Sequence, residues 1–193
     1  MKKIITIILI ILMCVFTITV VYATDEAILL PLPGLEKQEK SQWCWAASAR
    51  NSVHNEMENH RTQKAAVMHI KGTLLNWYPN EPGDIFETAE AAEYISKGTE
   101  DYCGENGAAI FQFLKFEVDN HNATIVGYSF YNGDKRIGGH MVVITGYYIM
   151  GNSNYVVYYD PEDGLSHTCL YSDFCDGSYN GGIYNATCFN TEN

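Results

Sequence analysis

The apolar pattern of this 193-residue chain changes near residue 120, and that change narrows the fold class more than any other feature. Before it, apolar residues recur every three or four positions, which predicts helices over 44–58, 62–76, 85–96 and 107–119. After it, β-branched and aromatic residues are frequent, which predicts strands over 123–131, 140–150, 155–160, 166–171 and 183–189. Helices followed by antiparallel strands indicate the α+β class.

Short polar sequences mark the boundaries of these elements. Asp84 precedes an apolar helical run, and Glu87 follows three residues later, as in a capping box. The sequences NGD at 132–134 and GNSN at 151–154 are typical of turns, so the strands on either side of the second one are predicted to form a hairpin. Residues 24–40 are predicted to be an extended lead into the first helix.

Residues 1–23 have the composition of a secretory signal peptide. Two lysines precede a long uncharged apolar run, and Val21 and Ala23 occupy the small-residue positions of a cleavage site. The apolar run, residues 4–23, is also long enough to span a bilayer, so an uncleaved anchor is the alternative. In either case the lysines stay inside, and residues 24–193 are predicted to be a single domain outside the cell.

The charge of the chain limits its partners. Removal of the signal peptide takes away two lysines and no acidic residue, which changes the formal net charge from −11 to −13. An acidic surface is a poor match for phosphate backbones or anionic membranes, so we expect no nucleic acid and no membrane contact beyond the possible anchor. No cofactor or metal is expected either, because His167, Cys169, Cys175 and Cys188 lack a standard zinc spacing.

Five cysteines follow residue 23, and secreted proteins usually pair their cysteines. An odd number leaves one thiol over, and Cys44 is the candidate because it starts a predicted helix, where the helix dipole favours the thiolate. The alternatives for Cys44 are a buried core thiol or a disulfide partner. The other four are candidates for two disulfides, with three possible connectivities: Cys103, Cys169, Cys175 and Cys188.

A nucleophilic cysteine needs a base and an orienting group. His140 follows two glycines and opens a strongly apolar strand, in contrast to the five other histidines. Asp160 ends the next strand, directly before Pro161. If the hairpin turns at 151–154, His140 and Asp160 lie at the same end of the strand pair, where the carboxylate can orient the imidazole. The alternatives are a strand-end histidine with a structural role and an aspartate that only forms the following turn.

The motifs QWCWAAS, GGHMVVITGY and YYDP, in this order, resemble the papain-like cysteine proteases. The likeness is to the compact bacterial branch that includes the plant-pathogen avirulence proteases and the bacteriocin-leader peptidases. It extends from about Gln38 to about Gly164. Two features depart from that branch: the strand before GGH lacks a Gly-x-Pro-like segment, and the Tyr-rich tail from Cys169 to Cys188 has no evident counterpart.

The resemblance implies a papain-like fold, with N-terminal helices that carry the cysteine and an antiparallel sheet that carries the histidine and the aspartate. It also implies that Cys44 attacks the acyl carbon, that His140 is the base and that Asp160 orients His140. Gln38, six residues before the cysteine, would help to form the oxyanion hole, and Gln42 is the weaker candidate for this role. The substrate would be a protein or peptide, and the enzyme a monomer.

Two other functions fit the same residues. A cysteine–histidine pair also serves acyl-transfer enzymes of other kinds, such as transglutaminase-like enzymes and peptidoglycan amidases. The chain could also be a non-catalytic extracellular binding protein on a protease scaffold, because fold alone does not fix function.

Overall fold

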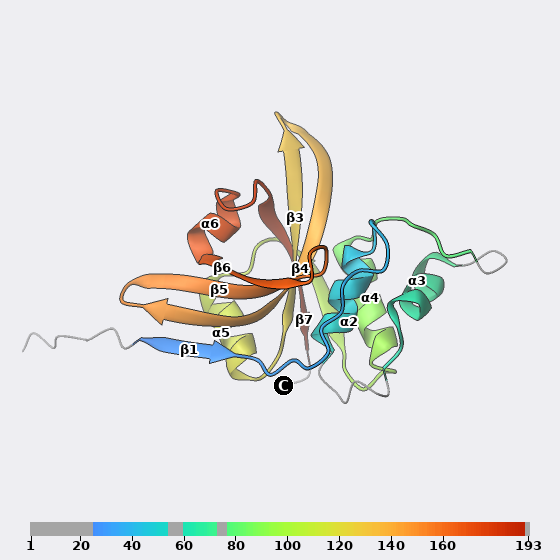
Figure 1. The fold of residues 1–193 in the computed structure, drawn as a ribbon, viewed down its shortest axis with the longest axis horizontal. Coiled ribbons are helices and arrows are strands. Elements are labelled where there is room, and N and C mark those ends of the chain that lie inside the picture. The colour runs from blue at the N-terminus through green and yellow to red at the C-terminus, as the bar shows by residue number, and fades with distance from the viewer. Residues whose placement is uncertain (1–24, 54–59, 73–76, 192–193) are drawn as a thin grey trace, which may run out of the picture.

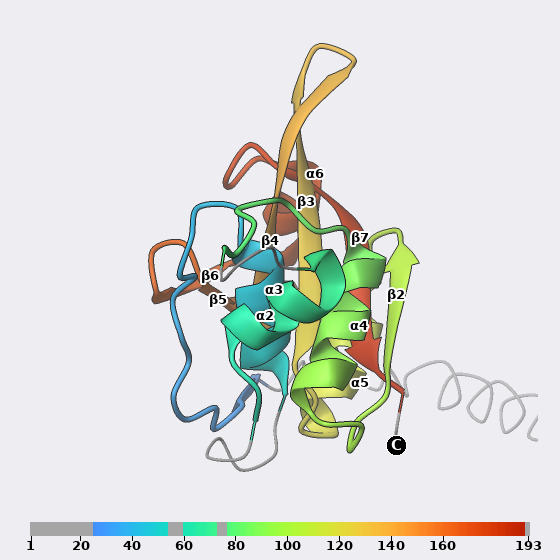
Figure 2. The same ribbon diagram turned by 90° about the vertical axis from the view of Figure 1, so that its right-hand side faces the viewer.

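The computed structural model describes residues 25–53, 60–72 and 77–191. Three helices, α2 (Cys44–Ser52), α3 (Gln63–Lys71) and α4 (Ile85–Ile95), lie together on one side of the strands (Figures 1 and 2). The predicted signal peptide or anchor, residues 1–23, lies outside the described residues. Within the described ranges, no helix has the length and apolar character needed to cross a membrane.

The described strands form one seven-stranded antiparallel sheet, with six strands in the order β2-β7-β3-β4-β5-β6 and β1 paired with β4. Strands β3 and β4 form a hairpin that extends beyond the rest of the described chain (Figures 1 and 2). The class is therefore α+β, as the pattern predicts. The strands are β1 (Glu26–Leu29), β2 (Tyr102–Asn106), β3 (Thr124–Asn132), β4 (Lys135–Met150), β5 (Ser153–Asp160), β6 (Leu165–Leu170) and β7 (Ile183–Asn190).

The helix starts follow the local sequence. Asp84 and Glu87 form the predicted capping box at the start of α4, with each side chain accepting a backbone N–H of the other residue. The Thr62 side chain caps α3. Helix α3 ends at Gly72, whose φ of 74° is in the left-handed region that glycine tolerates best. The last positions predicted for the first two helices, 54–58 and 73–76, lie outside the described residues.

The fourth predicted helix starts later than expected. Helix α5 spans Phe111–Asp119 rather than 107–119. The backbone N–H of Ala109 donates to the Tyr184 hydroxyl, and its carbonyl accepts a hydrogen bond from the Tyr171 hydroxyl. These bonds to the C-terminal tail hold the backbone of Ala109 outside the helix. Helix α6 (Tyr171–Asp176) and strands β1 and β2 are also present, although the sequence pattern did not predict them.

The predicted disulfides are absent: all five described cysteines are free thiols. Cys103 lies opposite Phe189 in the β2–β7 pair, and Cys188 lies opposite Gly104. Neighbouring side chains of a strand alternate between faces, so Cys103 and Cys188 lie on opposite faces of the sheet. Cys169 is on β6, and burial raises the pKa of its thiol to about 12. Cys175 is on α6, where its thiol is hydrogen-bonded with Tyr171.

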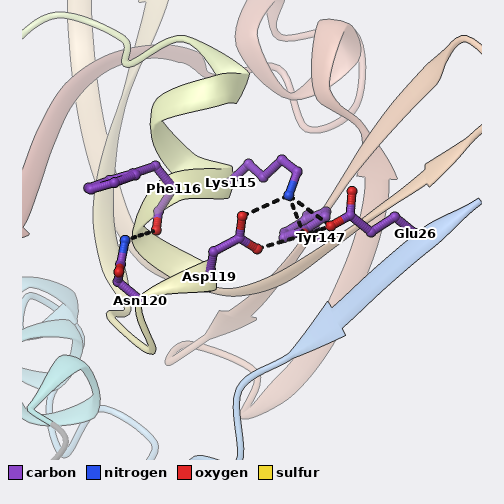
Figure 3. Close-up of polar contacts among 6 residues, drawn as sticks. All are labelled: Glu26, Lys115, Phe116, Asp119, Asn120 and Tyr147. Carbon is purple, nitrogen blue, oxygen red and sulfur yellow. Dashed lines mark hydrogen bonds and ion pairs between the residues drawn. The ribbon is translucent and has the colours of Figure 1, made fainter.

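Four side chains attach β1 to the rest of the domain, and we call them the Lys115 cluster: Glu26, Lys115, Asp119 and Tyr147 (Figure 3). The ammonium of Lys115 donates to Glu26 Oε1 at 2.8 Å, to Asp119 Oδ2 at 2.7 Å and to the Tyr147 hydroxyl at 2.8 Å. Burial lowers the pKa of Lys115, but these hydrogen bonds outweigh burial and raise it above its ordinary value. The cluster thus joins β1, α5 and β4 through charge-assisted hydrogen bonds.

Candidate active site

Two tryptophans fix the start of α2. Trp43 and Trp45 are fully buried, and their indole N–H groups donate to the carbonyls of Pro79 at 2.8 Å and Glu81 at 3.1 Å. A Cβ on Gly83 would lie 2.5 Å from the Trp45 ring, so the 79–83 segment approaches the helix start as closely as glycine allows. The tryptophans are therefore core residues that fix the position of the residue between them.

That residue, Cys44, is the first residue of α2 and has a partly exposed free thiol. The first N–H groups of a helix have no partner within the helix, so the backbone N–H of Cys44 is available to a bound ligand. Helix α2 packs on β4, where the Ser48 hydroxyl donates to the carbonyl of Met141 at 3.1 Å. This contact places the start of the helix beside His140, the residue before Met141.

His140 and Asp160 are neighbours on adjacent strands, as the predicted hairpin requires. Val143 pairs with Tyr159 in the antiparallel β4–β5 pair, so the register brings Asp160 opposite Val142. Val142 lies two residues after His140 on β4. His140 Nε2 and Asp160 Oδ1 are 2.7 Å apart. The His140 ring is also hydrogen-bonded with Cys44. Since Nε2 is engaged by Asp160, Nδ1 is the ring nitrogen left for the thiol.

The two partners of His140 set its charge. Burial lowers the pKa of His140, but hydrogen bonds with Asp160 and Cys44 outweigh burial and raise it to about 10. Burial also raises the pKa of Asp160, and the hydrogen bond with His140 outweighs it and holds that pKa below the ordinary value. The site therefore favours an imidazolium beside a carboxylate at neutral pH. Asp160 Oδ1 also accepts the N–H of Glu162 at 2.8 Å, so it forms the following turn as well.

Gln38 contacts the turn that follows Asp160. Its backbone N–H donates to the carbonyl of Pro161 at 2.8 Å, which ties the extended lead to the end of β5. Its side-chain oxygen is buried and has no hydrogen-bond partner among the described residues. Gln42 also lines the site, and its backbone N–H donates to Asn80 Oδ1 at 3.0 Å.

These residues line one cleft of about 630 Å³, which we call the catalytic cleft. One wall comes from the lead, the start of α2 and the 82–83 segment, and the other comes from the β3–β4 hairpin and the end of β5. The structure therefore brings together five residues that the sequence singled out: Gln38, Gln42, Cys44, His140 and Asp160. Other residues that line the cleft include Tyr128, Arg136 and Asn180. Among the described residues, no group of three or more metal-binding side chains is present.

The remaining histidines of the described chain have other surroundings. His69 stacks on Tyr94, and His167 pairs with Asp163 at 2.7 Å on the exposed side of the β5–β6 turn. None of His60, His69, His121 and His167 lines the catalytic cleft. His140 is thus the one described histidine that faces the Cys44 thiol there.

A thiol at a helix start, an imidazole oriented by a carboxylate and a nearby amide are the groups that nucleophilic acyl transfer requires. The family model described as "Peptidase_C39 like family" matches residues 33–185, which include all of these groups. The chain belongs to this peptidase C39-like family. A search of curated proteins finds no match.

Solved structures support the same conclusion about the fold. One similar structure is "Structure of digestive procathepsin L2 proteinase from Tenebrio molitor larval midgut", with a TM-score of 0.54 and 14% sequence identity. The match covers 82% of this chain and 64% of that chain, so this member of the C39-like family spans less than two thirds of its neighbour's length. The fold is papain-like, with the N-terminal helices followed by the antiparallel sheet.

Proposed function

We propose that this chain is a secreted cysteine peptidase that hydrolyses peptide bonds through Cys44, His140 and Asp160. The observation that carries the proposal is the continuous hydrogen-bonded row from Asp160 through His140 to Cys44, which lies in a cleft large enough for a peptide. The composition of residues 1–23 supports secretion, with an anchor at residues 4–23 as the variant. Protein or peptide substrates follow from the reaction type.

The first half of the reaction forms an acyl-enzyme. The Cys44 thiolate attacks the carbonyl carbon, a C–S bond forms, and the carbonyl oxygen takes up the negative charge. The backbone N–H of Cys44 and the side-chain amide of Gln38 stabilise this oxyanion. The intermediate then collapses, the C–N bond breaks, and His140 transfers its Nδ1 proton to the leaving amine.

The second half releases the acyl group. His140, now neutral, takes a proton from a water molecule that attacks the thioester carbon. The same two donors stabilise the second oxyanion. The C–S bond breaks, and the Cys44 thiolate leaves beside the His140 imidazolium, so the starting state returns. Asp160 does not exchange a proton in either half; it holds the imidazole in place and stabilises its charged form.

The proposal is tested by labelling and by cleavage. Iodoacetamide should alkylate Cys44 of the folded protein at pH 6, well below the ordinary cysteine pKa of about 8.5, and His140→Ala should abolish this low-pH labelling. His167→Ala is the matched control, because His167 also pairs with an aspartate but lies outside the cleft.

The same protein is then incubated with a peptide library prepared from a bacterial proteome, and new termini are identified by mass spectrometry. We expect cleavage that Cys44→Ala abolishes, with water added across each cleaved bond. Transfer of the acyl group to an added amine instead of water would show an acyl transferase. Failure of every peptide, together with no labelling at pH 6, would overturn the catalytic proposal in favour of a binding protein.

A further inference from the structure

A second pocket, of about 520 Å³, adjoins the catalytic cleft, and we call it the side pocket. It lies between the start of α4 and the β3–β4 hairpin, beside Asn185 and Ala186 near the start of β7. The two cavities are adjacent, because five residues line both: Pro82, Gly83, Tyr128, Arg136 and Met141. A peptide that passes Cys44 therefore has an adjacent space into which one of its side chains can enter.

Arg136 is the cation at the junction of the two cavities, and its guanidinium is held in place. Its Nε donates to the Ser129 hydroxyl oxygen at 2.9 Å. Ser129 is only 3% exposed, and the same oxygen accepts a hydrogen bond from Asn185 Nδ2 at 2.8 Å. Residues of β3 and β7 thus hold the Nε end of the guanidinium, and its other N–H groups are left for a ligand.

The backbone beside the catalytic histidine makes room for this arginine. A Cβ on Gly139 would lie 2.5 Å from Arg136 Nη2 and 2.9 Å from the carbonyl oxygen of Tyr128. The guanidinium therefore lies against the backbone one residue before His140. A substrate group bound to Arg136 would lie close to the residues that act on the peptide bond.

The two carboxylates that line the side pocket, those of Asp84 and Glu87, are already engaged elsewhere. Asp84 Oδ1 accepts the backbone N–H groups of Phe86 and Glu87, both at 2.9 Å, at the start of α4. The Glu87 carboxylate pairs with Lys71 and accepts the N–H of Asp84. Within the described part of the chain, no carboxylate forms an ion pair with Arg136. Arg136 is thus a local positive charge on a chain whose formal net charge is −11.

We infer that Arg136 is a specificity determinant that binds an acidic side chain of the peptide substrate in the side pocket. The inference rests on the proposed function and specifies its substrate class: peptides with an aspartate or glutamate at one fixed position near the cleaved bond. Arginine suits this task because its planar fork binds a carboxylate through two parallel hydrogen bonds. The hydrogen bond with Ser129 fixes the fork before substrate binds, which reduces the entropy lost on binding.

The test compares cleavage-site profiles of three proteins: wild type, Arg136→Gln and Lys135→Gln. Lys135 is the matched control, because it is an exposed cation on the same strand and lines neither cavity. Profiling identifies the best-cleaved sequence, and two peptides are then made, one with the acidic residue and one with its amide counterpart. We expect kcat/KM of the wild type to favour the acidic peptide about tenfold or more.

The ratio of the two kcat/KM values should fall to near one in Arg136→Gln and remain high in Lys135→Gln. Arg136→Lys keeps the charge but loses the fork, so an intermediate ratio is expected. Cleavage that depends on Cys44 but shows no acidic preference, or a preference that survives Arg136→Gln, would overturn this inference and leave the proposed function standing. Absence of Cys44-dependent cleavage would overturn both.

Discussion

Replacement of Asp160 by asparagine separates the charge of the aspartate from its shape. Asparagine can still accept a hydrogen bond from His140 Nε2, so the ring keeps its orientation. The variant loses the negative charge that lies 2.7 Å from the ring. We therefore expect Asp160→Asn to remain active near neutral pH. As the pH is raised, the variant should lose activity at a lower pH than the wild type does.

The size of the change follows from the geometry. Two unit charges with centres about 4 Å apart interact by about 4 kcal/mol at an effective dielectric of 20, which corresponds to about 3 pKa units. Partial solvent exposure, 13% for the His140 side chain and 20% for Asp160, reduces this value, so a decrease of about 1–3 units is expected. The alkaline limit of activity should move from about pH 10 in the wild type to about pH 7–9.

The assay is the pH dependence of kcat/KM on a cleaved peptide, with the ring ¹⁵N resonances of the histidines followed by NMR over the same range. Asp163→Asn is the control, because Asp163 also lies 2.7 Å from a histidine, His167, in the same turn region. An alkaline limit that stays at about pH 10 in Asp160→Asn would refute the reasoning. An equal shift in Asp163→Asn would show a general charge effect rather than a specific pair.

The same pair contributes to stability with a defined pH dependence. The folded-state pKa of His140 is raised, so its contribution is complete below pH 6.5 and is lost as the pH rises through about 10. The folded-state pKa of Asp160 is lowered, so its contribution is complete above pH 3.8 and is lost as the pH falls through the lowered value. The difference in Tm between wild type and Asp160→Asn should therefore be greatest between pH 3.8 and 6.5 and decrease on both sides. A constant difference from pH 3 to 10 would contradict this linkage.

Three further substitutions test other parts of the structure. Gln38→Ala should lower kcat by about 100- to 1000-fold with little change in KM, whereas Gln42→Ala should change kcat much less; equal losses would remove Gln38 from the oxyanion hole. Lys115→Met should lower Tm by a few degrees at pH 7, as measured by calorimetry. The difference should shrink as the pH falls below about 4, because the folded-state pKa values of Glu26 and Asp119 are lowered and their contribution is lost as the pH falls through those values. Gly83→Ala should destabilise the fold by about 1–3 kcal/mol in urea titrations, because the new methyl group meets the fixed ring of Trp45; unchanged stability would show that the 79–83 segment can move away.

Much of the fold was predictable because its signals are local. The capping box at Asp84, the turn at 132–134 and the turn after Met150 each depend on a few adjacent residues, and each appears in the structure. Strand β4 begins at Lys135, five residues earlier than predicted, because the β3–β4 hairpin continues to its turn through a segment with no apolar alternation. Pairing with β3 rather than burial maintains the strand there.

The missed elements depend on distant partners. Strand β1 is short, and it forms because β4 offers a free edge and the Lys115 cluster fixes its start. Helix α6 has six residues, and its position follows from Phe174, which is fully buried against Tyr128, Tyr158 and Tyr184. The disulfide prediction was wrong for a similar reason. Cysteine counting carries no information on strand register, and the register places Cys103 and Cys188 on opposite faces.

The candidate site also combines contacts that follow from local sequence with contacts that depend on distant parts of the chain. The proximity of His140 and Asp160 could be predicted, because one hairpin turn fixes which residues of two adjacent strands are neighbours. The contact between Cys44 and His140 depends on the packing of α2 on β4, which no local pattern specifies. The sequence suggested it only indirectly, through the need of a nucleophilic cysteine for a base, the unusual context of His140 and the family resemblance. The sequence gives even less indication of a role for Arg136, since it is an exposed arginine near a turn, where arginines are common. Its position is set by the absent side chain of Gly139 and by the buried hydroxyl of Ser129. The GGH sequence therefore has two consequences in the structure: it opens the strand that carries the histidine, and it makes the space in which Arg136 lies beside it.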